Sequence, residues 1–138
     1  MNQLVMRERL CLVVVDDPSI RAYIVTLLQR EEHFETLEAD GGRRALDIMK
    51  ALGDALDLIV SDVQMPGGDG VSFAHSVREL FADVPIILVS GNAQPPDALE
   101  FEFVEKPFAP HELLQVVRRV LAQGPGTVST IPTMLFGR

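Results

Sequence analysis

Three acidic residues stand where apolar stretches of the sequence end. Asp16 and Asp17 directly follow the apolar residues 10–15, and Asp62 comes two residues after the apolar residues 58–60. Continuous apolar, partly β-branched runs without helical periodicity predict strands that are buried on both faces of a parallel sheet. Open α/β sheets bind ligands just outside the carboxyl ends of their strands, so these carboxylates are candidates for a functional site.

We expect Asp16, Asp17 and Asp62 to lie close together, because the first and third strands are neighbours in a doubly wound sheet of order 2-1-3-4-5. Carboxylates in such a cluster either raise one another's pKa values or hold a cation. Mg²⁺ fits best, since it takes oxygen ligands, keeps several waters and commonly joins one or two carboxylates to a phosphate. The acidic residues therefore predict a Mg²⁺ site.

A lysine and a hydroxyl are expected at the ends of two further strands. Lys106 is one of only two lysines in the chain, and Pro107 follows it directly. At the end of the fifth expected strand, its ammonium could pair with Asp62 or with a phosphoryl oxygen. Ser90 ends the fourth expected strand and adds a hydroxyl at the same edge. Such a set suits phosphoryl transfer, which needs a positioned nucleophile and neutralisation of charge on the phosphoryl oxygens.

Alternating strands and helices would position these residues. Apolar runs predict strands at 10–15, 34–39, 56–62, 86–89 and 101–104, and helical spacing predicts helices at 18–31, 45–52, 71–81 and from 110 onward. This alternation implies a parallel sheet with right-handed crossovers. The expected fold class is α/β, a flavodoxin-like (βα)5 three-layer sandwich with strand order 2-1-3-4-5.

Glycine and proline interrupt this pattern at three places. Gly53 is expected to end the second helix as its C-terminal cap. Residues 65–70, Met-Pro-Gly-Gly-Asp-Gly, are expected to form a shaped loop, because proline and glycine suit neither a strand nor a helix. Pro95 and Pro96 exclude a long helix that begins directly after the fourth strand.

The combined motifs resemble the receiver domain of two-component response regulators. The likeness spans residues 10–122, and its motifs are Asp16-Asp17, Asp62 followed by Met65-Pro66, Asp69-Gly70, Ser90 and Lys106-Pro107. The resemblance implies that Asp62 accepts a phosphoryl group from the phosphohistidine of a sensor histidine kinase or a histidine phosphotransfer protein. It also implies that the reaction requires Mg²⁺ and that the chain is no enzyme beyond its own phosphorylation and dephosphorylation.

The resemblance also assigns roles within the site. It implies that Asp17, Asp62 and the backbone carbonyl of Gln64 are Mg²⁺ ligands, and that Asp16 acts through water. Lys106 and Ser90 would hold the phosphoryl oxygens, with Ser90 as a switch residue. Phe103 matches the aromatic switch position, where Tyr is more usual in the family, so a buried ring here carries no hydroxyl that needs a partner.

The main departure from the family lies between Ser90 and Lys106, where the chain is shorter than usual. Helix four is therefore expected to be short or missing. Many receivers dimerise through a face built from their fourth and fifth units, and a truncated face should fall short of the roughly 1,000 Å² of a stable interface. We expect a monomer that signals by phosphorylation-dependent protein binding or acts as a phosphate sink.

The composition of the chain limits its number of domains, its binding partners and its cellular location. The 138 residues, 47% hydrophobic and 23% charged, predict one domain at 1–123 and a flexible tail or linker stub at 124–138. The net charge of −8 argues against direct nucleic-acid binding. No apolar run approaches the roughly 20 residues of a membrane span, so we expect a cytoplasmic protein. Cys11 is expected to be a buried small hydrophobe, and His33, His75 and His111 to lie at the surface.

Other functions are weighed against the receiver. The chain could be the receiver module of a hybrid kinase or of a larger regulator. A Mg²⁺-dependent aspartyl-phosphate phosphohydrolase of the haloacid-dehalogenase type carries a second Asp two residues after its nucleophile, where this chain has Gln64. A phosphorylation-independent module with this fold typically lacks an acid or the lysine, and neither is missing here. Gly67 and Gly68 lack the following Lys and Ser/Thr of a nucleotide-binding P-loop.

Overall fold

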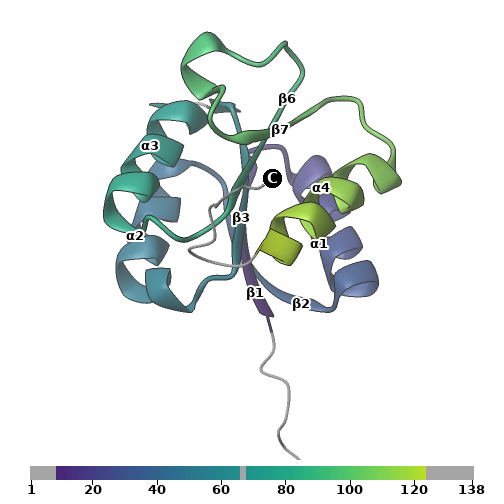
Figure 1. Ribbon diagram of the computed structural model, residues 1–138, viewed down its shortest axis with the longest axis horizontal. Helices are drawn as coiled ribbons and strands as arrows, with labels where there is room; N and C mark the ends of the chain where they lie inside the picture. Colours follow the sequence, from purple (N-terminus) through teal and green to yellow (C-terminus); the bar gives the residue numbers. More distant parts are fainter. Residues whose placement is uncertain (1–8, 66–67, 124–138) are drawn as a thin grey trace, which may run out of the picture.

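A five-stranded parallel sheet runs through the molecule, with helices on both of its faces (Figure 1). We describe residues 9–65 and 68–123 of this computed structural model. The sheet strands in chain order are β1 (Arg9–Val14), β2 (Phe34–Ala39), β3 (Leu58–Asp62), β6 (Ile86–Ser90) and β7 (Glu102–Glu105). Their spatial order is β2-β1-β3-β6-β7, and all four neighbouring pairs are parallel. The predicted order 2-1-3-4-5 is confirmed.

Within the described residues, four α-helices and two short 3₁₀ helices follow the strands along the chain. They are α1 (Pro18–Glu32), α2 (Gly42–Leu52), η1 (Gly53–Ala55), α3 (Gly70–Leu80), η2 (Pro96–Ala98) and α4 (Pro110–Gln123). Asp17 caps α1, with Pro18 in its first turn, and Asp69 caps α3 by accepting a hydrogen bond of 2.7 Å from the Ser72 amide. These caps satisfy amides that have no partner within the helix, so α1 and α3 each begin directly after a capping aspartate.

The core consists of two apolar layers, one on each face of the sheet. Leu12, Val14 and Ile59 face the layer under α2 and α3, whereas Cys11 and Val13 face the layer under α1 and α4. This alternation follows from the pleat of a strand, in which successive side chains point to opposite faces. The three-layer sandwich is confirmed. Cys11 is fully buried, and burial raises the pKa of its thiol, as befits an unreactive core residue.

The crossover from β6 to β7 contains only η2 as helix. The prediction that helix four is short or missing is thus confirmed for this described stretch. At the two described ends of the predicted loop at 65–70, the chain forms a short ladder instead, in which β4 (Gln64–Met65) pairs antiparallel with β5 (Gly68–Asp69). Residues 66 and 67 lie outside the described part.

Gly53 ends α2 as its C-terminal cap, as the sequence predicts. Its φ and ψ are −51° and −42°, a right-handed conformation that any residue can adopt. A Cβ at this position would come within 2.4 Å of the outer atoms of the Phe81 ring, so a larger residue here would require that ring to move.

No helix within the described ranges is both long and apolar enough to cross a membrane. The predicted tail or linker stub at 124–138 lies outside those ranges.

Candidate functional site

Asp62 ends β3 as a buried carboxylate. Only 4% of the residue is exposed, and the Lys106 Nζ lies 3.0 Å from its Oδ1. Burial raises the pKa of Asp62 above its ordinary value of 3.8. The Lys106 ammonium opposes this rise, and the Asp16 charge adds to it. A buried acid with one cationic partner and a second acid nearby has excess negative charge.

Lys106 reaches Asp62 from the end of β7. Its backbone amide donates a hydrogen bond of 2.6 Å to the Ser90 carbonyl, which continues the pairing of β6 and β7 past their ends. The peptide bond to Pro107 is cis. The predicted pairing of Lys106 with Asp62 is therefore present in the structure.

Ser90 ends β6 and is 1% exposed. Its neighbour Val89 is the β6 residue in register with Asp62, so Ser90 stands at the same edge of the sheet. The Ser90 Oγ accepts a hydrogen bond of 3.1 Å from the Asn92 amide. That bond places the hydroxyl at the first turn of the β6–β7 crossover, while its predicted contact with phosphoryl oxygens stays a prediction.

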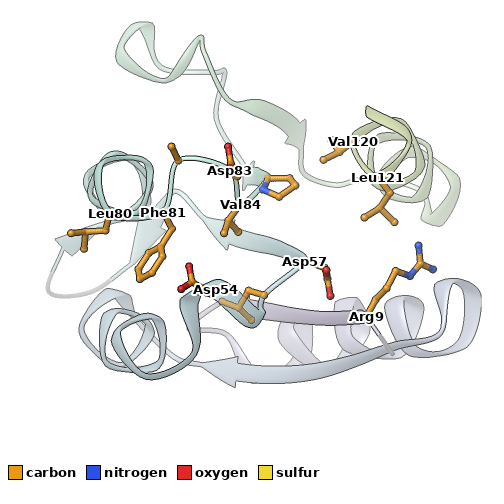
Figure 2. Close-up of a pocket in the computed structure, with 12 residues that line it drawn as sticks. Arg9, Asp54, Asp57, Leu80, Phe81, Asp83, Val84, Val120 and Leu121 are labelled. Carbon is orange, nitrogen blue, oxygen red and sulfur yellow. The ribbon is translucent and has the colours of Figure 1, made fainter. Parts of the chain in front are cut away.

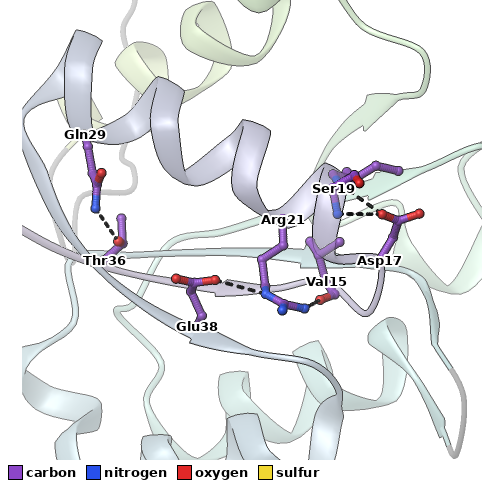
Figure 3. Close-up of polar contacts among 8 residues, drawn as sticks. Val15, Asp17, Ser19, Arg21, Gln29, Thr36 and Glu38 are labelled. Atoms are coloured by element: carbon purple, nitrogen blue, oxygen red, sulfur yellow. Dashed lines mark hydrogen bonds and ion pairs between the residues drawn. The ribbon is translucent and has the colours of Figure 1, made fainter.

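Asp16 and Asp17 face different surroundings. Asp16 is half-buried and close enough to raise the pKa of Asp62. Asp17 is exposed, and its Oδ1 accepts hydrogen bonds from the amides of Ser19 (2.8 Å) and Ile20 (3.1 Å) (Figure 3). Across residues 9–65 and 68–123, no three acidic, His or Cys side chains form a group that could hold a metal ion.

The predicted convergence of three carboxylates is therefore not found in this arrangement. The physical reason is that the amides at the start of α1 attract the Asp17 carboxylate, because they have no other partner. The charge of Asp16 acts on Asp62, whereas the adjacent Asp17 caps α1. The metal assignment itself stays a prediction.

Arg21 holds the backbone that follows β1, directly before the acidic pair. Its Nη1 donates a hydrogen bond of 2.7 Å to the Val15 carbonyl, and its Nε lies 3.0 Å from the Glu38 Oε1 on β2 (Figure 3). The Val15 amide also donates to the Ala39 carbonyl at 3.0 Å. These contacts fix the point at which the chain turns from β1 into α1.

The backbone after Asp62 is held from several directions. The Val63 amide donates to the Val89 carbonyl at 2.9 Å, and the Gly70 amide donates to the Val63 carbonyl at 2.6 Å. The Ser61 hydroxyl donates to the Asp62 carbonyl at 3.0 Å. A Cβ on Gly70 would lie 1.9 Å from that same carbonyl oxygen. Only glycine lets the start of α3 approach so closely.

Sequence reasoning missed two of these contributions. Ser61 is a fully buried hydroxyl that directly follows the apolar residues 58–60 of β3, and that contrast was a signal available in the sequence. The need for Gly70 depends on a tertiary contact that spacing does not reveal. Gln64, the predicted source of a carbonyl ligand, lies exposed in β4. Phe103 is half-buried in β7 and packs against the layer under α2 and α3, and its switch role stays a prediction.

Comparison with known proteins gives the family. The sequence pattern of the response regulator receiver domain matches residues 11–118. Sensor kinase CckA of Brucella abortus (strain 2308) is 37% identical over 117 residues, which make up 80% of this chain and 12% of the kinase. The chain also spans about half of several transcriptional regulators, for example 51% of ResD of Bacillus subtilis.

Solved structures agree. Chemotaxis protein CheY4 of Vibrio cholerae is 30% identical with a TM-score of 0.75, and the match covers 83% of this chain and 99% of CheY4. Response regulator TrrA of Thermotoga maritima, solved in complex with Mg²⁺ and BeF, is 32% identical with a TM-score of 0.73, covering 81% of this chain and 98% of TrrA. The family match extends from β1 into α4 around the buried acid at the end of β3, and the chain belongs to the response regulator receiver domain family.

Proposed function

We propose that Asp62 accepts a phosphoryl group from the phosphohistidine of a sensor histidine kinase or a histidine phosphotransfer protein. The observation that carries this proposal is the buried Asp62 carboxylate at the end of β3, paired with Lys106 at 3.0 Å. In the transfer, a carboxylate oxygen forms the new bond to phosphorus while the bond to the histidine nitrogen breaks. The imidazole leaves with the electron pair of that bond.

Lys106 and Ser90 assist from neighbouring strand ends. The Lys106 ammonium would balance charge on the phosphoryl oxygens, and the Ser90 hydroxyl would donate to one of them. Because the Lys106 backbone amide donates a hydrogen bond to the Ser90 carbonyl, the two residues are held in a fixed relative position. A structural change at Asp62 on phosphorylation would therefore move Lys106 and Ser90 together.

Asp16 and Asp62 supply carboxylate oxygens at this edge of the sheet, and Mg²⁺ prefers oxygen ligands. Asp16 and Asp62 place two carboxylates against one ammonium, so a further cation would neutralise the excess charge. We propose that Asp17, Asp62 and the Gln64 carbonyl hold Mg²⁺, with Asp16 acting through water. The Mg²⁺ and BeF in the related TrrA structure support this proposal. When bound, the ion would stabilise negative charge on the transferring group.

The test is direct phosphorylation. Incubation with acetyl phosphate and Mg²⁺ should add one phosphate by intact mass, and chelation of Mg²⁺ should prevent it. Asp62→Asn should accept none. Asp54→Asn is the matched control, because Asp54 is exposed in η1 and remote from the strand end. Equal labelling of Asp62→Asn and the wild type would refute the assignment.

The output is proposed more coarsely. We propose that the phosphorylated chain acts in the cytoplasm as a monomer, by binding another protein or by draining phosphate from its kinase, with no other enzymatic activity. The missing helix in the β6–β7 crossover supports this, because the usual dimer face is incomplete. Sedimentation velocity should show a monomer with and without beryllofluoride. A tight dimer formed only with beryllofluoride would contradict the proposal.

The relatives favour a second context. The match to CckA covers 12% of that sensor kinase, so this sequence is also consistent with the receiver module of a hybrid kinase or a larger regulator. The phosphorylation chemistry at Asp62 would be the same in either context. The sequence of the neighbouring genes and of the full-length product separates them.

A further inference from the structure

A cavity of about 630 Å³ opens at the edge of the sheet opposite Asp62 (Figure 2). Arg9 begins β1 there, Asp57 directly precedes β3, and Pro85 directly precedes β6. The end of α4 contributes Val120 and Leu121 from the side. The receiver chemistry at the other edge uses none of these residues.

The cavity combines an apolar wall with an acidic rim. The wall includes Val84 and Leu121, and Leu80 on the same rim is 59% exposed, so it adds apolar surface that a bound segment could cover. The charged residues of the lining are three aspartates, Asp54, Asp57 and Asp83, and one cation, Arg9. This chemistry suits an apolar segment that also carries a positive charge.

The sequence supplies such a segment shortly after Leu121, the last residue that lines the cavity. Residues 124–138, which lie outside the described part, contain a short apolar cluster and a single charged residue, an arginine. These are Ile131, Met134, Leu135, Phe136 and Arg138. The described chain leaves α4 at Gln123, two residues after Leu121, which itself lines the cavity. Eight residues of extended chain span about 26 Å, enough to return residue 131 to the cavity.

Tethering makes a weak contact sufficient. A segment joined to its site by a short linker has an effective concentration on the order of millimolar, so it occupies the site without high intrinsic affinity. We propose that residues 131–138 dock into this cavity, with Leu135 and Phe136 against its apolar wall and Arg138 toward the aspartates. The proposal does not depend on phosphorylation of Asp62.

Paramagnetic labelling tests the proposal in the full chain. Gly137→Cys would carry a nitroxide, and Cys11 would not react because it is fully buried. We expect loss of amide peak intensity at Asp83 and Leu121, with the Ser19 amide at the opposite edge unaffected. No loss at the cavity would overturn the proposal.

Two variants and a mixing experiment identify the occupant. In the labelled chain, Leu135→Ser with Phe136→Ser should restore the cavity peaks, as should Leu80→Ser on the exposed rim, whereas Val128→Ser should not. Loss of intensity that survives the paired substitution would overturn the proposal. In a mixture of ¹⁵N-labelled chain without nitroxide and unlabelled chain with nitroxide, the cavity peaks should stay sharp. Broadening in that mixture would show that a second copy fills the cavity instead.

Discussion

The two crossovers on either side of β6 cover the same face of the sheet by different means. The first, from β3 to β6, uses α3, which buries Val71, Ala74 and Val77 in the layer under α2 and α3. The second, from β6 to β7, has only η2, yet it buries Ala98 and Phe101 in that same layer. A helix is thus not required to cover this part of the sheet.

Side chains replace the missing helix in the second crossover. The Gln94 Nε2 donates to the carbonyls of Ala98 (3.0 Å) and Phe101 (3.1 Å). From α3, the His75 ring meets the Phe101 ring edge-on at 5.1 Å, and the Arg78 guanidinium carbon lies 5.0 Å from its centroid. Anchoring by amide and aromatic contacts therefore substitutes for the backbone bonds of a helix.

His75, like Arg78, joins the two crossovers. It lies partly exposed at the surface, as expected, contacts Phe101, and has its Nε2 2.9 Å from the Asp97 carbonyl. The second crossover thus depends on the first, whereas α3 has its own cap and its own buried stripe. Substitutions in the two crossovers should therefore differ in their effects on stability.

Gly70→Ala should have the largest effect. Its Cβ would meet the Asp62 carbonyl oxygen at 1.9 Å, which forces the backbone of the acceptor strand and α3 apart. We expect a loss of roughly 4 kcal/mol in the free energy of unfolding. Gly91→Ala in the second crossover is the matched control, because its Cβ would have no neighbour within 4 Å. Urea unfolding measures both, and equal losses would contradict the comparison.

Phe101→Ala should follow. The ring is 4% exposed, so its removal leaves a cavity and should cost about 3 kcal/mol of unfolding free energy. Leu99→Ala, two residues away and 69% exposed, should change stability by less than about 0.5 kcal/mol. If both substitutions had similar effects in urea unfolding, the crossover would not be anchored through its buried ring.

Gln94→Ala should have an intermediate effect confined to the second crossover. Loss of two hydrogen bonds should cost about 1 to 2 kcal/mol. It should also speed hydrogen exchange at the amides of Ala98 and Phe101, which close the turns around η2. Exchange in α3 should change little. Asn92→Ala is the control, because Ser90 bonds to the Asn92 backbone and not to its side chain. Faster exchange throughout α3 would show that the two crossovers are one unit.

The pH dependence at Asp62 should be the smallest effect. Since burial raises the pKa of Asp62, the folded state binds this proton more tightly than the unfolded state does. The ionised carboxylate therefore costs stability at neutral pH, and the cost disappears as the pH falls through the raised folded pKa. Without Mg²⁺, we expect Asp62→Asn to exceed the wild type in unfolding free energy by about 1 kcal/mol near neutral pH.

That stability difference should shrink as the pH falls toward the ordinary value of 3.8. Asp47→Asn, at an exposed position in α2 away from the cavity, is the matched control and should show no such trend relative to the wild type. Urea titrations at a series of pH values measure both. A difference that grows on acidification would mean that Lys106 outweighs burial at this site.

The order of the elements, and the edge of the sheet at which Asp62 and Lys106 lie, could be predicted from the amino-acid sequence. Apolar runs mark β1, β3 and β6 because strands of a parallel sheet are buried on both faces. Asp62 and Lys106 could be paired from sequence because the carboxyl ends of parallel strands meet at one edge. The absence of a long helix after β6 followed from Pro95 and Pro96, which cannot belong to a helix interior.

Which groups the side chains at these positions contact depends on the tertiary structure. Asp17 and Asp62 both follow strands, but Asp17 turns to the amides of α1 while Asp62 turns inward to Lys106. Gly70 is needed because α3 approaches the acceptor carbonyl, a backbone contact that spacing along the chain does not reveal. Spacing along the chain fixes which edge or face a residue occupies, whereas contacts between distant segments depend on how those elements pack in three dimensions.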